Sequence, residues 1–457
     1  MLLRAGVVIA VAGLTLIALP AVQAQAGKTL AADLPAAPQP HNAEWRAMRE
    51  RLLSDRLPEK PSLPPAFTIP VEPLGFSAPS VNYLGQRWCV ASLDFLDENR
   101  VLFTFRVPGL LHRDPNDDGA SGERQIRALV LQLPAGTVEA EALWTVHDRA
   151  RYLWMLKDGH FLLRDRDSLR QGDSTLVLKP ALEFPGPLLW LETDPGEQFL
   201  VTNSREPATA TPKPGPVTSP ASAEGSVSTD GERSQAQQGK GAPDLVLRIL
   251  RRDSGKVMLV SRVRTVVHLP INADGYLELL RGNGQQWILN LDYFEGGSST
   301  LVRVESECTP NFDFVSQREV LVTACATSGA SNLVAVDTDG RQLWQDATSG
   351  ALVWPLLKMA PNGLRIARET LAVTHAVNAF APMDSDDVKG QVVRVLDAAN
   401  GKLAFEAPAS PALDGGGNMA ISPSGRRVAV LNSGAVQVFE LPAPAPLPGA
   451  AASQTAH

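Results

Sequence analysis

One segment has the residue types and spacing of a calcium-binding loop. It begins at Asp114 and reads Asp-Pro-Asn-Asp-Asp-Gly, which places the oxygen donors Asp114, Asn116 and Asp118 at alternate positions before a glycine. Donors spaced in this way converge on one hard cation in calcium loops. The twelfth position is Gln125, where a bidentate Glu is typical, and Glu123 comes two residues early. Two interpretations therefore stay open, a calcium site and a solvated acidic turn, because turns favour the same residues.

The three cysteines allow one disulfide and exclude a four-cysteine metal site. Cys308 and Cys325 flank an expected hairpin at residues 311–324, so they should stand almost opposite each other across two antiparallel strands. We expect them to form a disulfide, because the chain carries an export signal and would fold under oxidising conditions. Two buried thiols are the alternative. Cys89 is left over and is expected to be a buried strand residue.

No known catalytic signature is present. The sequence contains no G-x-S-x-G, H-E-x-x-H, P-loop or G-x-G-x-x-G pattern, and its seven histidines occur singly. Lone histidines such as His160 and His268 more often pack or form hydrogen bonds than catalyse. The formal net charge of -7, without any run of Lys and Arg, argues against nucleic acid as a partner. We therefore assign no catalytic residue, and no cofactor apart from the calcium considered above.

Short apolar runs separated by Gly, Asp, Asn and Pro occupy residues 65–441. The elements that these runs form must position the residues of any site. One hairpin pattern recurs, for example at 359–367 and 419–429, and a second hairpin with an aromatic or large apolar residue follows most copies, for example at 334–344. Two hairpins make a four-stranded sheet, and repeats spaced by roughly 40 to 60 residues are typical of propeller blades. The predicted fold class is all-β, a single β-propeller with about seven four-stranded blades.

The turns of these hairpins resemble those of known propellers. Ser422-Pro423-Ser424-Gly425 and Ala360-Pro361-Asn362-Gly363 resemble the S-P-D-G turn of WD-repeat and TolB-like propellers. Residues 334–344 resemble the blade repeat of quinoprotein-like propellers, with Asp337, Gly340 and Trp344 in the corresponding places. The resemblance covers about residues 67–441 and implies the β-propeller superfamily. The G-H and W-D dipeptides of true WD repeats are missing, so no binding residue is transferred.

Several segments lie outside the repeated pattern. The last blade has only three strands of its own, and the isolated strand-like segment Phe67–Val71 is expected to supply the fourth and close the ring. Residues 205–243 are rich in Pro, Ser, Thr and Gly and are predicted to be a disordered insertion in blade three. The tail at 442–457 is also predicted to be disordered.

The N-terminus has the pattern of a cleavable signal peptide. Arg4 precedes an uncharged apolar stretch that ends at Pro20, and small residues at Val22, Ala24 and Ala26 follow. We predict a signal peptide at 1–24, with cleavage after Ala24 or Ala26, because the apolar stretch is short for a membrane span. A Pro- and Ala-rich lead at 25–64, with a short amphipathic helix near 42–57, should precede the propeller.

These observations predict a periplasmic or secreted propeller that acts as a binding scaffold for a protein or a small molecule. The mature chain is expected to be a monomer without a membrane span. The alternative is an enzyme with its site in the central channel, either a quinone-dependent dehydrogenase or a metal-dependent lyase or lactonase. Acidic and His side chains that converge at the channel would favour the enzyme, whereas an apolar patch on one face would favour the scaffold.

Overall fold

The computed structural model describes residues 57–79, 88–107, 123–148, 150–206, 244–325, 331–348, 353–373, 384–413, 415 and 417–444. The chain divides into two units, Met1–Met48 and Arg49–His457, and all of these residues belong to the second. The predicted signal peptide, almost all of the amphipathic helix and the calcium candidates Asp114, Asn116 and Asp118 lie outside the described residues. The predicted insertion lies outside them from residue 207, and its first two residues, Arg205 and Glu206, end a strand instead. The predicted tail lies outside them from residue 445.

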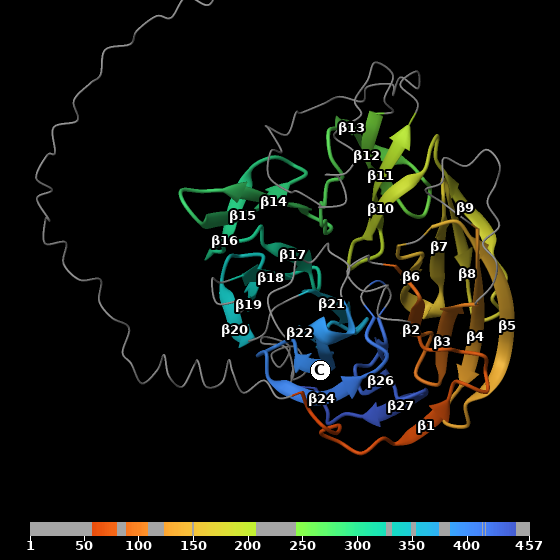
Figure 1. The fold of residues 1–457 in the computed structure, drawn as a ribbon. Coiled ribbons are helices and arrows are strands. Elements are labelled where there is room, and N and C mark those ends of the chain that lie inside the picture. The colour runs from red at the N-terminus through yellow and green to blue at the C-terminus, as the bar shows by residue number, and fades with distance from the viewer. Residues whose placement is uncertain are drawn as a thin grey trace, which may run out of the picture. The chain divides into compact units, whose positions relative to one another are not determined.

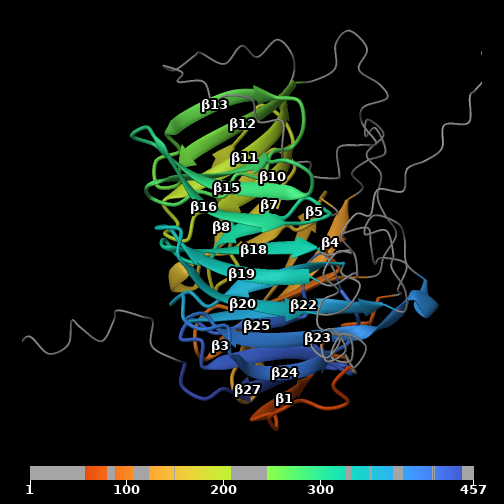
Figure 2. The same ribbon diagram turned by 90° about the vertical axis from the view of Figure 1, so that its left-hand side faces the viewer.

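The described strands form seven antiparallel sheets, arranged around a ring as the blades of a propeller (Figure 1). Figure 2 shows the sheets of one side stacked in chain order. The strands, grouped by blade from one to seven, are β2 (Ala91–Phe95), β3 (Arg100–Arg106), β4 (Arg124–Gln132), β5 (Thr137–Val146); β6 (Leu153–Met155), β7 (Phe161–Asp165), β8 (Ser168–Gly172), β9 (Lys179–Glu183); β10 (Leu188–Thr193), β11 (Phe199–Glu206), β12 (Asp244–Arg251), β13 (Val257–Val263); β14 (Gly275–Arg281), β15 (Gln286–Tyr293), β16 (Ser298–Glu305); β17 (Asn311–Phe314), β18 (Glu319–Cys325), β19 (Ser331–Asp337), β20 (Gln342–Thr348); β21 (Val353–Met359), β22 (Arg365–Val373), β23 (Val388–Asp397), β24 (Leu403–Ala409); β25 (Met419–Ile421), β26 (Arg427–Asn432), β27 (Ala435–Glu440) and β1 (Phe67–Pro70).

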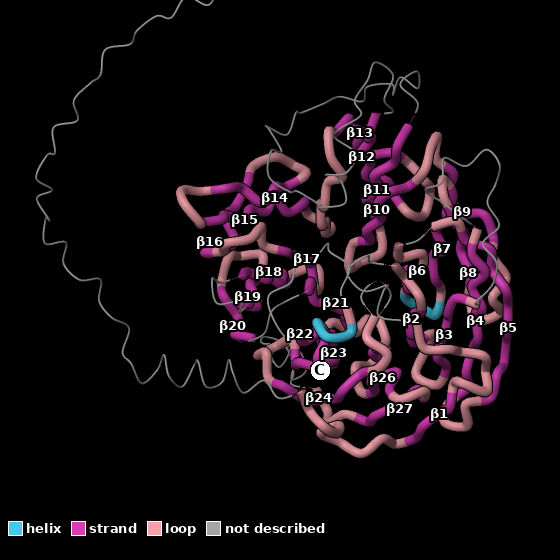
Figure 3. Tube along the Cα trace, viewed as in Figure 1, coloured by secondary structure: helices cyan, strands magenta, loops and turns pink. Residues whose placement is uncertain are grey.

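The all-β propeller predicted from the sequence is therefore confirmed. Helix within the described residues is limited to short 3-10 segments such as η2 (Lys157–Gly159) and η4 (Ser385–Asp387), visible as the small cyan pieces of Figure 3. No helix in the described part of the chain is long and apolar enough to cross a membrane.

Blade seven is closed by the N-terminal strand, as the sequence predicts. β1 pairs antiparallel with β27, and the register places Phe67 opposite Val438 and Ile69 opposite Val436. Ile69 is buried against residues of blades seven and one. Because β1 occupies the outer edge of β27, segments from the two ends of the propeller share one sheet and leave no open edge on that strand.

Blade four departs from the four-stranded pattern. Its sheet contains β14, β15 and β16, and the segment that should form the inner strand pairs with β14 through one isolated bridge, Ile271 to Tyr276. Pro270 has no N–H to donate to a ladder. Asn203 of blade three replaces part of the missing strand pairing in blade four. Its side chain donates to the Val267 carbonyl at 2.9 Å and accepts from the Val267 N–H at 3.0 Å.

The core is distributed over the junctions between blades. Each of the seven junctions carries a cluster of buried apolar side chains among the described residues; the clusters are represented by Leu93, Phe161, Leu200, Ile271, Val320, Ile366 and Phe405. The inner strand β2 is buried along its whole length, whereas the outer strand β5 is mostly exposed and buries Trp144 and Val146 near its end. Apolar side chains therefore pack on both faces of the inner strands, and this packing holds those strands in place around the axis.

The turns that follow the inner strands bind one another around the ring. Glu98 of blade one accepts from the Ser424 N–H of blade seven at 2.6 Å, and the Asn362 side chain of blade six donates to the Ser424 carbonyl at 2.7 Å. Gln317 of blade five accepts from the Ala273 N–H of blade four and donates to Asp194 of blade three. These bonds fix the inner strands at a common height and so determine which of their side chains meet near the axis.

Candidate functional site

Four inner strands carry a charged side chain at the same height, that is, at the same level along the axis of the ring. In each blade a backbone N–H closes the turn after the inner strand; the closing residues include Leu96, Asp194, Val315 and Ala360. The residues two positions earlier are Asp94, Glu192, Asp313 and Lys358, of blades one, three, five and six. Because side chains alternate along a strand, residues at this shared position point to equivalent places in the ring.

Asp94 and Lys358 form an ion pair between blades that are not neighbours. The Lys358 Nζ lies 2.8 Å from Asp94 Oδ1 and 2.7 Å from the Leu93 carbonyl, while the Ser92 hydroxyl donates to Asp94 Oδ2 at 2.6 Å. Blade seven separates blades one and six in the ring. The two side chains therefore meet on the inner side of blade seven, close to the ring axis, and both carboxylate oxygens of Asp94 are engaged.

His268 joins blades three, four and five. Its Nδ1 bonds Glu192 Oε1, which also accepts from the Trp190 indole, and its Nε2 donates to the Phe312 carbonyl at 2.7 Å. Burial alone would lower the pKa of His268, but the charges of Glu192 and Asp313 and these hydrogen bonds raise it to about 10. His268 is therefore an imidazolium at neutral pH and has no free nitrogen for a metal or for proton abstraction.

Asp313 pairs with His268, and Arg151 packs against an aromatic ring. Asp313 Oδ1 lies 3.5 Å from His268 Nε2, and the side chain keeps 44% of its exposure. Burial inside the ring raises the pKa of Asp313 to about 6, opposed by the charge of His268. Arg151 donates its Nε to the Leu153 carbonyl at 2.9 Å, and its guanidinium lies 5.0 Å from the centre of the Trp154 ring.

We call Asp94, Arg151, Glu192, His268, Asp313 and Lys358 the axial cluster. Sequence reasoning missed all but His268, which it described as a residue that packs or forms hydrogen bonds. Four of these residues occur singly on different strands, and Arg151 and His268 lie outside the strands, so no local motif marks them. The one signal available was the shared position of Asp94, Glu192, Asp313 and Lys358 two residues before the turn-closing residue, which becomes visible only when the hairpins are aligned.

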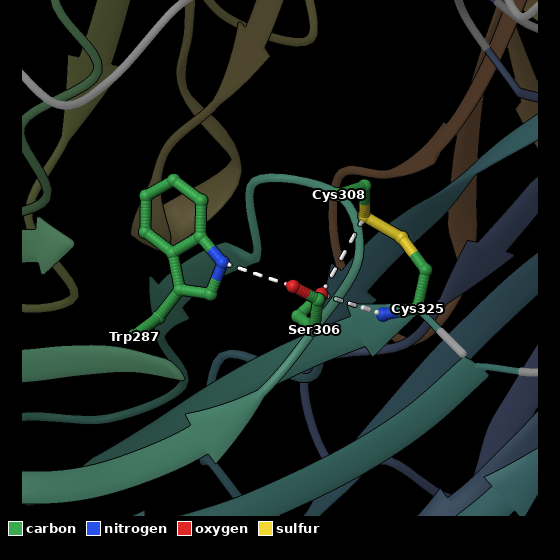
Figure 4. Close-up of a disulfide and its surroundings, with 4 residues drawn as sticks. All are labelled: Trp287, Ser306, Cys308 and Cys325. Atoms are coloured by element: carbon green, nitrogen blue, oxygen red, sulfur yellow. Dashed lines mark hydrogen bonds between the residues drawn. A yellow bond between two sulfur atoms is a disulfide. The ribbon is translucent and has the colours of Figure 1, made fainter. Parts of the chain in front are cut away.

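The predicted disulfide is present. Cys308 and Cys325 are bonded, with Cα atoms 5.7 Å apart (Figure 4). Ser306 supports it: its hydroxyl accepts from the Cys325 N–H at 2.9 Å, and its carbonyl accepts from the Trp287 indole at 3.1 Å. The disulfide thus ties the segment after β16 to the end of β18. Cys89 is buried, as expected, but it lies two residues before β2 and not in a strand. Burial raises its pKa to about 12.

The residues that resemble a quinoprotein repeat serve the structure of blade five. Asp337 accepts from the Arg341 N–H at 2.8 Å across the turn between β19 and β20, where Gly340 has a φ of 82°. Trp344 is buried at the junction with blade six and donates to the Ala398 carbonyl at 2.5 Å. The structure therefore places these residues at a turn and at a blade junction. Among the described residues, no group of three or more His, Cys, Asp and Glu side chains is arranged to hold a metal ion.

Comparisons with known proteins find similar folds only. No protein-family model matches the chain, and no curated protein matches it. Solved structures with a similar fold include an acylaminoacyl peptidase from Pyrococcus horikoshii, with 8% identity over 79% of this chain and 52% of that chain and a TM-score of 0.41. TolB from Acinetobacter baumannii has 12% identity over 74% of this chain and 76% of that chain, with a TM-score of 0.35. Hydrazine synthase from Kuenenia stuttgartiensis has 9% identity over 77% and 94%, with a TM-score of 0.40. The chain thus spans about half of the peptidase, and the similarity concerns the propeller fold alone.

Proposed function

We propose that this protein is an exported β-propeller that binds a protein or a small molecule with the axial cluster. The observation that carries the proposal is that blades one, three, five and six each carry a charged side chain at one height, where Lys358 bonds Asp94 and His268 bonds Glu192. Polar groups that converge in this way, among inner strands fixed by seven apolar junctions, are typical of a recognition site. Export is supported by the signal sequence and by the Cys308–Cys325 disulfide, which is stable in oxidising compartments.

The second candidate function is an enzyme at the axis. It is favoured by one observation, the convergence of Glu192, His268 and Asp313, since Asp313 has a pKa near 6 and stays accessible to solvent. Against it, both nitrogens of His268 are engaged, and the ring is held as a cation that cannot accept a proton. We therefore place binding first, and we retain quinone-dependent oxidation and metal-dependent lyase or lactonase chemistry only within this second candidate.

The test compares the effect on binding of a change in the axial cluster with that of a change on the outer surface of the propeller. The mature chain, its double variant Arg151→Met/Asp313→Asn and the outer-strand variant Leu143→Ser are immobilised and exposed to a native envelope extract. Bound species are identified by mass spectrometry. Leu143 is 61% exposed and lies on β5, at the outside of blade one. We expect a species that wild type and Leu143→Ser retain and the axial double variant loses.

Two further measurements accompany the capture. Circular dichroism must show the same fold for all three chains, so that a loss of binding reports on the site. The N-terminus of the chain recovered from envelope fractions should be Gln25 or Gly27. Loss of the bound species with Leu143→Ser and its retention by the double variant would place recognition on the outer strands and contradict the proposal.

A further inference from the structure

Blade four leaves one edge of β14 without a paired strand. Every other sheet in the described part of the chain has four strands, whereas the chain between β13 and β14 is a loop (Figure 3). This loop meets β14 only near its start, where the Leu277 N–H donates to the Pro270 carbonyl at 2.9 Å and Ile271 bridges Tyr276. The next ladder bond, to the Leu277 carbonyl, would come from the N–H that proline lacks. The ladder therefore ends at Pro270.

Backbone groups on this edge of β14 have no partner beyond Pro270. Hydrogen bonds alternate between the two edges of a strand, so the bond of Leu277 places the N–H and C=O of Leu279 and the N–H of Arg281 on the same edge. None of these groups forms a hydrogen bond with any group that the structure describes. Glu278 and Leu280 pair with β15 on the other edge. These main-chain groups therefore stand in line for a further strand.

The segment that would normally supply this strand is held by the neighbouring blades. Val267 uses both its N–H and its C=O on the Asn203 side chain of blade three. The His268 side chain bonds Glu192 of blade three and the Phe312 carbonyl of blade five, and its backbone makes no hydrogen bond to β14. These contacts hold the segment in place and leave the Leu279 groups to another strand.

The carboxyl groups beside this edge favour a basic partner. Glu278 lies between Leu277 and Leu279 on β14. Asp292 of β15 has a buried oxygen, Oδ2, without a hydrogen-bond partner among the described residues. Burial, followed by the charge of Asp292 and a hydrogen bond between the two carboxyl groups, raises the pKa of Glu278 to about 6. A side chain opposite Glu278 in an added strand would lie about 4.5–5.5 Å from it, between Cβ atoms, so a cation there would stabilise both carboxylates.

We propose that the free edge of β14 binds an extended segment of a partner protein, which becomes the fourth strand of blade four and carries a Lys or Arg opposite Glu278. An extended backbone offers alternating acceptors and donors at the spacing of Leu279 and Arg281. This inference goes beyond the proposed function, because it adds a second recognition element that uses none of the side chains of the axial cluster.

Hydrogen exchange of the mature chain, resolved to single residues by mass spectrometry, tests the edge itself. We expect the amide of Leu279 to exchange at least about tenfold faster than those of Glu278 and Leu280, because only the latter two face β15. Equal protection of Leu279 and Leu280 would show that the inner segment pairs with β14 in solution. That result would overturn the proposal.

A phage-displayed library of random linear octapeptides supplies the probe for binding. We expect the selected peptides to carry β-branched residues at alternate positions together with Lys or Arg, and calorimetry of the best synthetic peptide compares the variants. Glu278→Lys should weaken binding by about tenfold or more through like charge. Glu305→Lys, at the exposed end of the outer strand β16, should leave binding unchanged. Circular dichroism must show the same fold for both variants.

N-methylation along the same peptide reports how it binds. In an added strand only alternate N–H groups face β14, so methyl groups should weaken binding with a period of two residues, by about threefold or more at each sensitive position. Selection of no peptide, equal binding by wild type and Glu278→Lys, or no alternation would each overturn the proposal. The proposed function would still stand after such a result if the captured species depended on Arg151 and Asp313.

Discussion

Glu319 is a buried carboxyl group with an unsatisfied oxygen. It begins β18, is 5% exposed, and its Oε1 has no hydrogen-bond partner in the described part of the chain. At the same position of blades six and seven, Arg365 donates to the Gly425 carbonyl and Arg427 to the Glu98 carbonyl of the next blade. An ionised Glu cannot donate in this way. Burial raises the pKa of Glu319 from its ordinary value of 4.5 to about 7.

We predict that Glu319→Gln stabilises the protein at alkaline pH. The folded chain holds a proton on Glu319 between about pH 5 and 7 that the unfolded chain has lost, so the free energy of unfolding falls as pH rises through this window. Gln remains neutral, and the variant should gain up to about 3 kcal/mol at pH 8 and little at pH 4. Urea titrations from pH 4 to 8 measure this, with the exposed Glu305→Gln as control. Equal pH slopes for both variants would show that Glu319 is not the group responsible.

The axial cluster shows why sequence predicted the fold better than the site. Hairpin turns are local, and a residue such as Gly363 or Gly425, with φ of 73° and 66°, marks its turn in the sequence itself. Asp94 and Lys358 are separated by more than half of the chain and meet only after the ring closes. The sequence around a single charged residue on a strand does not indicate which distant residue it will contact. The disulfide could be predicted because one hairpin brings Cys308 and Cys325 together.

At the scale of the element, the inner segment of blade four depends on a side chain of blade three. Asn203 is fully buried and bonds both the N–H and the C=O of Val267, which replaces part of the missing strand pairing. Pro270 is the local feature that accompanies the irregularity, but nothing in the sequence near Asn203 identifies it as the compensating group. His268 follows directly after Val267, so this contact also positions the axial cluster.

We predict that Asn203→Ala lowers the free energy of unfolding by about 2–4 kcal/mol, because it leaves a buried donor and a buried acceptor without partners. Asn203→Asp keeps the acceptor for the Val267 N–H and loses the donor, so it should also destabilise. Asn432→Ala, which removes two marginal contacts, one of 3.5 Å to Gln437 and one of 3.3 Å to Ser433, should cost less than about 0.5 kcal/mol. Chemical denaturation followed by tryptophan fluorescence compares the three variants. A cost for Asn203→Ala no larger than that for Asn432→Ala would show that Val267 does not need this partner.

At the scale of the whole molecule, the ring is held closed by non-covalent contacts between its two ends. β1 is four residues long, yet it pairs with β27 along its length and places Ile69, at 4% exposure, in the cluster between blades seven and one. The segment before it adds a separate contact, because Ser62 bonds the backbone of Glu406 in blade six. A chain that begins after β1 therefore loses the closing strand and the Ser62 contact together, and a point variant in β1 is needed to examine the strand by itself.

We predict that a chain beginning at Val71 loses stability and associates, whereas a chain beginning at Leu57 keeps the stability of the mature protein. Removing β1 deletes the buried Ile69 side chain, worth about 2–5 kcal/mol by itself, and exposes the backbone edge of β27. An exposed edge pairs with other chains, so the shorter protein should show a lower melting temperature and a concentration-dependent mass by light scattering. Ile69→Ala in the longer chain separates the two effects, since it removes the side chain and keeps the edge covered: it should lower the melting temperature without association. If the chain beginning at Val71 melts like the chain beginning at Leu57 and stays monomeric, β1 does not close the ring, and the stability of the propeller resides in the junctions between the other blades.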